Sequence, residues 1–298
     1  MTVVMLPYHQ DRRLPADMLP LPPGAAAVVL DAAGVLSAAG VPDAAGVPDA
    51  AGVPDAAGVL SAAGVPDAAG APDGDAPGGM WPRLAALNSA AAGQVAAAVR
   101  AGDPVTVIGG DCLFAAAALA GAQRAGLDPA IVWFDAHGDV HTRETTESGY
   151  LGGLALRLLL GAHPGDWARP IGLRPIAEDR ATLVGARDLD AAEERYLAAS
   201  AVRRCGVTAL NPDELPAGPL ILHVDVDVVD SAEMPGLLFP APGGPSTAEV
   251  VHAVRRVLAS GRVAVLNVAC PWGPPDDLGV ERVRRELLTS LMKAWPRS

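Results

Sequence analysis

The chain has 298 residues, half of them hydrophobic, and a formal net charge of −12. This length suits one large domain with a buried core, or two small ones. An acidic chain without a basic cluster is a poor candidate for binding nucleic acid or an anionic membrane, and no apolar run reaches the roughly 18 residues that span a bilayer. The first residues, MTVVMLPYHQDRR, show no basic stretch followed by an apolar segment, so we expect no signal peptide. The three cysteines are widely spaced, which predicts no disulfide framework and a cytoplasmic location.

Strand patterns alternate with helical patterns along most of the chain. In chain order we expect a strand at 2–6, a helix at 83–101, strands at 105–108 and 130–134 separated by a helix at 113–121, a helix at 152–160, a strand at 181–184, a helix at 191–199, strands at 207–210 and 220–224, a helix at 247–258 capped by Ser246 or Thr247, a strand at 263–268 and a helix at 281–295. Such alternation predicts βαβ units and an α/β fold, with a parallel sheet covered on both faces. Chemistry in these sheets lies at the carboxyl ends of the strands.

Residues 32–73 stand apart, because they repeat a six-residue unit, AAGVPD, with the variants AAGVLS and AAGAPD. A period of six can indicate a parallel β-helix. Proline and glycine in most units break regular ladders, however. We therefore expect a disordered surface insertion or linker within a single domain that spans residues 1–298. Deleting the repeats is expected to leave folding intact, and a large loss of thermal stability would show that they are packed.

Acidic and imidazole side chains follow two of the apolar strands. Asp135, His137 and Asp139 come after the strand at 130–134, and Asp225 and Asp227 come after the strand at 220–224. In an extended chain alternate residues point the same way, so each set should project to one side. Close carboxylates repel one another unless a divalent cation lies between them, and oxygen ligands with imidazole suit Mn²⁺ or a similar ion. Two solvated loops are the alternative, but the recurrence of the pattern favours a metal site.

Three motifs resemble those of the arginase (ureohydrolase) family in order and spacing: VIGGDC at 107–112, DAHGDVH at 135–141 and HVDVDVVD at 223–230. The resemblance covers roughly residues 80–275. It implies a three-layer α/β domain around a mainly parallel, eight-stranded sheet. It also implies two Mn²⁺ ions that bridge a hydroxide, which attacks the guanidinium carbon of arginine or a relative and releases urea. Relatives form trimers or hexamers, which implies a homo-oligomer.

The same resemblance implies a set of site residues. Ser148, in SGY at 148–150, matches a loop that grips the α-carboxylate of the substrate. Asp190, in VGARDLD at 184–190, matches an acidic residue that meets the α-amino group, although Asp188 and Asp190 could equally be ordinary acids at a helix N-terminus. The metal ligands would be Asp135, His137, Asp139, Asp225, Asp227 and Cys112, with Asp139 also holding the hydroxide.

Several positions depart from the family pattern. Cys112 replaces a histidine ligand, and a thiolate prefers Zn²⁺ or Co²⁺ to Mn²⁺, so one metal position would be weak, altered or empty. Gly152 stands where the family has a histidine that shuttles protons, and His141 is a candidate catalytic replacement or a substrate contact. Cys270 stands where a glutamate faces the guanidinium, and Asn267 replaces an aspartate. Without that carboxylate, a cationic guanidinium loses a charge-assisted partner.

These departures leave several functions open. A less basic guanidine, such as N-hydroxyarginine, needs less countercharge, and the chain resembles the divergent N-hydroxyarginine hydrolases in Cys112 and in GYLGG at 149–153. An ordinary arginase or agmatinase is a second reading. A catalytically degenerate binding or regulatory subunit is a third, but retained buried carboxylates are costly without a cation. A Zn²⁺-dependent deacylase fits Cys112 but lacks a supporting motif.

We expect His223 to pack beneath the metal site rather than bind metal. We also expect Cys112 and Cys270 to face one cavity, where they could share a metal or form a disulfide.

Overall fold

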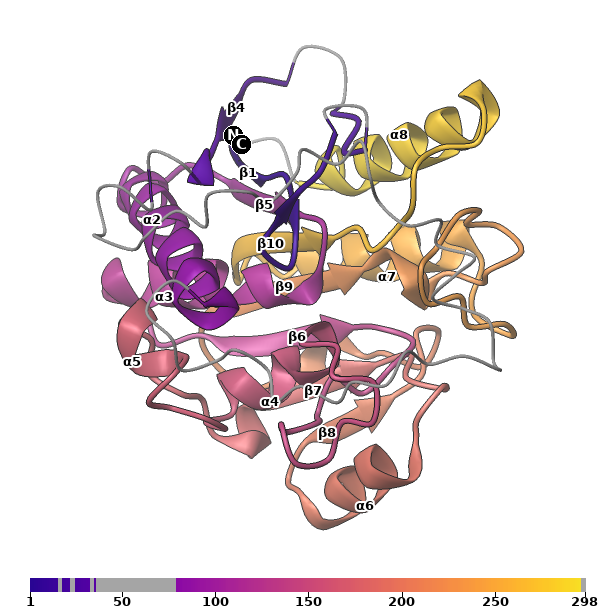
Figure 1. Ribbon diagram of the computed structural model, residues 1–298. Coiled ribbons are helices and arrows are strands. Elements are labelled where there is room, and N and C mark those ends of the chain that lie inside the picture. The colour runs from indigo at the N-terminus through magenta and orange to yellow at the C-terminus, as the bar shows by residue number, and fades with distance from the viewer. Residues whose placement is uncertain (16–17, 22–24, 33–34, 36–78, 296–298) are drawn as a thin grey trace.

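The computed structural model describes residues 1–15, 18–21, 25–32, 35 and 79–295. Apart from Ala32 and Val35, the repeat expected at 32–73 lies outside the described residues. Eight strands form one sheet in the order β4-β1-β5-β10-β9-β6-β7-β8, and every neighbouring pair is parallel (Figure 1). The strands are β1 Thr2–Leu6, β4 Ala27–Val29, β5 Val105–Gly109, β6 Ala130–Phe134, β7 Ala181–Val184, β8 Arg203–Cys205, β9 Leu220–Asp225 and β10 Val263–Ala269. The parallel, eight-stranded α/β architecture expected from the sequence is confirmed.

Helices cover both faces of the sheet, which is why its central strands are apolar on both sides (Figure 1). One face packs against α2 Met80–Arg100, α3 Ala115–Arg124, α4 Ala155–Leu159, α5 Ala168–Ile171 and α6 Ala191–Ala199. The opposite face packs against α7 Thr247–Ala259 and α8 Leu278–Met292. No helix in the described part of the chain has the length and apolar character needed to cross a membrane.

Local sequence signals explain where several helices begin. Ser246 caps α7 in a capping box with Glu249, as expected, and Asp277 caps α8. The alanine-rich helices α2 and α3 approach each other closely, because a β-carbon on Gly121 of α3 would lie 2.5 Å from the β-carbon of Val95 on α2. Small side chains therefore set the spacing of this layer.

The structure also corrects the sequence-based elements. The bounds expected for β1, β6, β7 and α6 are confirmed. The strand expected at 207–210 is wrong: residues 207–209 form a turn, and the eighth strand is β8, just before it. Val207 and Leu210 are buried because this connection packs onto the core as a loop. A short hairpin, β2 Tyr8–His9 with β3 Arg12–Arg13, was not expected.

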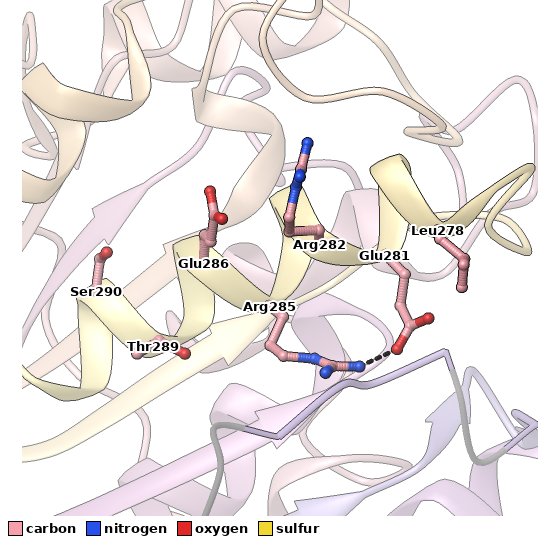
Figure 2. Close-up of a pocket in the computed structure, with 7 residues that line it drawn as sticks. All are labelled: Leu278, Glu281, Arg282, Arg285, Glu286, Thr289 and Ser290. Carbon is pink, nitrogen blue, oxygen red and sulfur yellow. Dashed lines mark hydrogen bonds and ion pairs between the residues drawn. The ribbon is translucent and has the colours of Figure 1, made fainter.

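A pocket lies along the outer side of α8 (Figure 2). Its walls come from a single helix, and Glu281 and Arg285 form an ion pair across it. None of these residues belongs to the strand ends that carry the polar motifs, so the pocket is a feature of the helix surface. Its lining residues are Leu278, Glu281, Arg282, Arg285, Glu286, Thr289 and Ser290.

Candidate metal centre

The carboxyl ends of β6 and β9 lie side by side in the sheet (Figure 1). Phe134 pairs with Val224 in the parallel ladder, so the residues that follow them, Asp135 and Asp225, reach the same edge. Both aspartates are almost completely buried, at 1% and 2% exposure. Two carboxylates buried side by side repel each other, and burial first, then neighbouring aspartates, raises the pKa of each.

A first group of possible ligands joins the two strand ends. The Nδ1 atom of His137 lies 3.0 Å from Oδ2 of Asp227 and 3.4 Å from Oδ1 of Asp135. Burial alone would lower the pKa of this imidazole, but the two carboxylates raise it to about 12. The backbone N–H of Ala136 donates to Oδ1 of Asp227 at 3.1 Å, which ties the two loops together. One donor atom from each of Asp135, His137 and Asp227 lies within 4.8 Å of the others.

Asp139 joins this cluster through a turn and not through an extended chain. Its backbone has a φ of 53°, in the left-handed region, so the alternation expected from the sequence ends before this residue. The carboxyl group is buried, and its Oδ2 atom has no hydrogen-bond partner among the described residues. Burial, followed by the charges of Asp135 and Asp225, raises its pKa well above the usual value.

Cys112 lies in the same cluster, where the sequence predicted it. It begins the short helix η2 Cys112–Phe114, which Asp111 caps by accepting from the backbone N–H of Leu113 at 2.9 Å. Its Sγ atom lies 2.7 Å from Oδ2 of Asp225 and 3.9 Å from Oδ2 of Asp135. Burial first, then the nearby carboxylates, raises the pKa of the thiol.

His223 is a buried neighbour of this thiol. Its Nδ1 atom lies 2.6 Å from Oδ1 of Asn267, and its ring stacks on Trp133 with the ring centres 3.6 Å apart. Burial lowers its pKa to about 4, so the imidazole is neutral at physiological pH. The structure brings His223, Cys112 and Asp135 together, each offering a donor atom within 4.8 Å of the others.

Another group of possible ligands, formed by His141, Asp190 and Glu193, lies at the start of α6. Nε2 of His141 lies 2.7 Å from Oδ2 of Asp190, whose Oδ1 accepts from the backbone N–H groups of Ala192 and Glu193. Asp190 is therefore a helix cap as well as the partner of His141. Glu193, which no sequence motif singles out, is buried and accepts from the backbone N–H of Val140 at 3.3 Å. Its place in the first turn of an exposed-looking helix gave no signal of burial.

The loop with Ser148 contributes an aromatic residue that sequence reasoning also missed. Ser148 is exposed, and its Oγ atom accepts from the backbone N–H of Tyr150 at 3.2 Å. The Tyr150 ring stacks on His9 and contacts Phe239, with ring centres 5.5 and 4.6 Å apart. Burial, then the charges of groups in the cluster, raises the pKa of the Tyr150 phenol. A β-carbon on Gly152 would lie 2.5 Å from the phenol oxygen, so this glycine makes room for the ring.

Cys270 is completely buried at the end of β10. It packs with the apolar cluster on the α7–α8 face, whereas Cys112 packs with the cluster on the opposite face. Both thiols are free. Burial, followed by the charge of Asp225, raises the pKa of Cys270. A cavity shared by the two cysteines stays a prediction.

The donor set fits a divalent cation. Three carboxyl groups, Asp135, Asp139 and Asp225, are buried, and after burial itself the charges of neighbouring carboxylates raise the pKa of each. Oδ2 of Asp139 and Nε2 of His223 are buried atoms without a hydrogen-bond partner in the described residues. A cation would neutralise the repulsion and supply partners for both atoms.

Comparisons with known proteins identify the family of the chain. The family model "Arginase family" matches residues 62–277, more than half of the chain. The arginase of Eremothecium gossypii is 30% identical over 197 residues, which are 58% of this chain and 48% of that protein. The N(omega)-hydroxy-L-arginine amidinohydrolase of Streptomyces lavendulae is 30% identical over 204 residues, 65% of this chain and 70% of that protein. The chain thus spans about half the length of the first relative and more of the second.

Solved structures show the same fold. The arginase of Bacillus caldovelox superposes with a TM-score of 0.68 at 21% identity, covering 97% of both chains. An arginase structure from Bacillus subtilis gives a TM-score of 0.60 at 26% identity, covering 70% of this chain and 78% of that one. The family match, the parallel sheet and the carboxylates at its strand ends lead to one conclusion: the chain belongs to the arginase family.

Proposed function

We propose that the protein is a metal-dependent hydrolase that cleaves a linear C–N bond in a guanidino-type amino acid, releasing urea or a substituted urea. The observation that carries this proposal is the cluster at one edge of the sheet, where Asp135, His137 and Asp227 each offer a donor atom within 4.8 Å of the others. Asp139 is buried beside them, close enough for the charges of Asp135 and Asp225 to raise its pKa. The relatives named above act, by their names, as an arginase and as an N-hydroxyarginine amidinohydrolase. Both reactions remove the amidino group of an amino acid by hydrolysis.

We call Asp135, His137 and Asp227 the oxygen-rich group. It would hold Mn²⁺, since carboxylates with one imidazole suit that ion. When bound, such ions lower the pKa of water, so that a nucleophile is available near neutral pH. Asp135 could be a ligand of two ions, because it belongs both to the group with His137 and to the group with Cys112. Asp139 would orient the nucleophile with its free Oδ2 atom.

His141 and Asp190 would handle the proton that the leaving group requires. The 2.7 Å contact of Asp190 with Nε2 of His141 fixes one side of the imidazole, and Oγ1 of Thr145 lies 3.1 Å from Nδ1 on the other side. Backbone donors at the start of α6 lower the pKa of Asp190 despite partial burial, so it stays a carboxylate beside the imidazole. These two contacts would hold the imidazole of His141 in one orientation, as a proton shuttle requires.

The expected substrate is a guanidine of low basicity, such as N-hydroxyarginine. Cys270 puts a neutral, buried thiol where a carboxylate would pair with a full positive charge. Tyr150 and Phe239 add an aromatic wall beside His137, whose ring centre lies 6.4 Å from that of Phe239. We place the α-carboxylate of the substrate at Ser148 and its α-amino group at Asp190. This placement follows the motif match, and both side chains lie at the outer rim of the site.

The remaining parts of the proposal concern the whole chain. We propose a single domain that works in the cytoplasm as a homo-oligomer. Three free cysteines fit a reducing compartment. The partner is a small guanidino amino acid.

The test combines metal content with product analysis. The purified chain is loaded with excess Mn²⁺, separated from free ion by gel filtration, and analysed for metal per chain. Arginine, agmatine and N-hydroxyarginine are then assayed for urea or hydroxyurea, beside an Asp227→Asn variant and a His252→Gln control on the exposed side of α7. Hydroxyurea from the wild type and the control, but not from Asp227→Asn, supports the proposal. A chain that binds no metal under any condition would overturn it in favour of a non-catalytic family member.

A further inference from the structure

We propose that His223 is a metal ligand, and that Cys112, Asp135 and His223 together bind one thiophilic divalent ion, Zn²⁺ or Co²⁺, beneath the carboxylates of the site. One donor atom from each of these three residues lies within 4.8 Å of the others. The set of sulfur, nitrogen and oxygen donors is typical of tetrahedral zinc sites and differs from the oxygen-rich group around His137.

The register of the sheet puts His223 directly under the site. Asp225 lies two residues further along β9, so its side chain and that of His223 point to the same face of the sheet. Across the sheet, His223 pairs with Trp133 of β6 on one side and with Asn267 of β10 on the other. Its imidazole is therefore one layer below the aspartates and faces Cys112 from the interior.

Asn267 decides which nitrogen of His223 carries the proton. Its Nδ2 atom donates to the backbone carbonyl of Val107 at 3.3 Å, which turns its Oδ1 atom toward His223. An amide oxygen only accepts, so Nδ1 of His223 must be the protonated nitrogen. Nε2 then has a free electron pair, is completely buried, and has no hydrogen-bond partner in the described residues.

A ligand imidazole in a metal site usually has this arrangement. Its second nitrogen donates to a carbonyl or carboxylate oxygen, which fixes the tautomer and the direction of the ring. Trp133 fixes the ring plane by stacking at 20° and also donates from Nε1 to Oδ2 of Asp135 at 3.0 Å. One indole therefore positions two members of the group. These contacts leave the electron pair of Nε2 of His223 free to bind a metal ion.

The group also accounts for the cysteine. The family has a histidine at the position of Cys112, and this chain supplies an imidazole from β9 instead. The ion would keep a nitrogen ligand, gain a thiolate, and share Asp135 with the oxygen-rich group. This inference rests on the proposed function only in that shared carboxylate, and metal binding is measured without substrate.

The experiment uses the full chain, reduced and stripped of metal, with Co²⁺ as the probe and Zn²⁺ as the competitor. The wild type should show thiolate-to-Co²⁺ charge-transfer absorption. It should also show hyperfine-shifted N–H proton signals from two ligand imidazoles, that of His223 and that of His137 in the oxygen-rich group. The signal of His223 should be slow to exchange, because its Nδ1 atom is buried. Zn²⁺ should abolish both signatures. This measurement needs no variant, so a folding defect cannot obscure it.

Variants then assign the signals. His223→Gln should remove the slowly exchanging signal and weaken Zn²⁺ binding more than about 100-fold, beyond the roughly 10–100-fold expected for Asn267→Leu, which removes only the orienting partner. The exposed control His252→Gln should change neither property. Unchanged Zn²⁺ affinity and an unchanged Co²⁺ spectrum in folded His223→Gln would overturn the inference.

The outcomes separate this inference from the proposed function. A chain that hydrolyses guanidino amino acids but shows no slowly exchanging imidazole signal loses the inference and keeps the function. A chain that shows the charge-transfer absorption and both imidazole signals, yet releases no urea or hydroxyurea from any substrate, keeps the inference and loses the function.

Discussion

The phenol ring of Tyr150 occupies the space that a side chain on Gly152 would need. A β-carbon there would lie 2.5 Å from the phenol oxygen. A histidine at residue 152 therefore could not coexist with the ring of Tyr150 in its present position. The aromatic wall of the site therefore depends on glycine at residue 152.

Restoring a histidine by Gly152→His should displace the ring of Tyr150. Because the clash involves the outer end of a side chain, we expect little change in Tm but a loss in kcat/KM of about 10–100-fold. Steady-state kinetics with N-hydroxyarginine measure this. The matched control is Gly153→Ala, whose β-carbon would meet its nearest atom, in His141, at an ordinary 3.6 Å. Equal kinetics for wild type and Gly152→His would contradict the prediction.

Arg187 should be essential for the shape of the loop after β9. Its guanidinium donates to the backbone carbonyls of Asp227 and Val228 at 3.2 and 3.0 Å, and to that of Ala241 at 2.8 Å. Arg187→Ala should lower the free energy of unfolding by roughly 2–4 kcal/mol, since several charge-assisted hydrogen bonds are lost together. Arg187→Lys should not rescue it, because an ammonium cannot match a planar fork of donors. Urea denaturation gives the values, with the exposed Arg195→Ala as control.

The metal-free protein should lose stability as the pH rises, partly through Asp139. Burial and neighbouring carboxylates raise its pKa above the ordinary 3.8, so folding disfavours the charged form. The stabilising contribution of the neutral acid is complete below the unfolded-state pKa and is lost as the pH rises through the folded-state pKa.

Asp139→Asn should remove this part of the pH dependence, and asparagine tolerates the left-handed backbone at this position. In chelator, the drop in Tm between about pH 5 and about pH 7.5 should shrink by roughly 2–4 °C, the shift that about 1 kcal/mol produces in a chain of this size. Added Mn²⁺ should raise the Tm of the wild type more than that of the variant. Thermal scans with and without metal measure both effects, and the same pH dependence in both chains would disprove this role.

Cys112→His should move the metal preference toward Mn²⁺. Replacing a thiolate by an imidazole makes the donor set harder, so the affinity for Mn²⁺ relative to Zn²⁺ should rise at least about tenfold, or roughly 1.4 kcal/mol. Competition between the two ions for the purified chain measures the ratio. Cys205→Ser, at a partly buried thiol on the edge strand β8, is the control. A ratio that stays the same would place Cys112 outside the metal site.

Sequence reasoning succeeded where the chain is buried and failed at the margins of the sheet. The strand β6 is a continuous apolar run, and β9 is apolar apart from His223 until it reaches Asp225, because helices cover both faces. The ends of both strands and the aspartates there could therefore be predicted. The two outermost strands, β4 and β8, have mostly exposed residues and carry no such pattern. The apolar residues Val207 and Leu210 predict a strand, because a short buried loop and a short buried strand have similar apolar patterns.

The residues of the site also divide into those that a local pattern predicts and those that it does not. The aspartates could be predicted because those of each motif lie within a few residues of one another in the sequence. The contact of His223 with Asn267 and the folding of Tyr150 over Gly152 depend on register and on turn geometry. Register between distant strands is set by the whole sheet, so no local pattern of residues contains it.

The position of β10 has a consequence for the order in which the protein folds. This strand is the last of the sheet along the chain, yet it lies between β5 and β9. Before it has been synthesised, the other strands can pair only within two groups, β4-β1-β5 and β9-β6-β7-β8, and β5 and β9 each lack the neighbour that β10 provides. Closing it joins residues as far apart as Val107 and Asn267, 160 positions, and such long-range pairing is slow. Any state in which strands form before β10 docks therefore exposes the edges of β5 and β9, and we expect aggregation of this protein to begin at those edges.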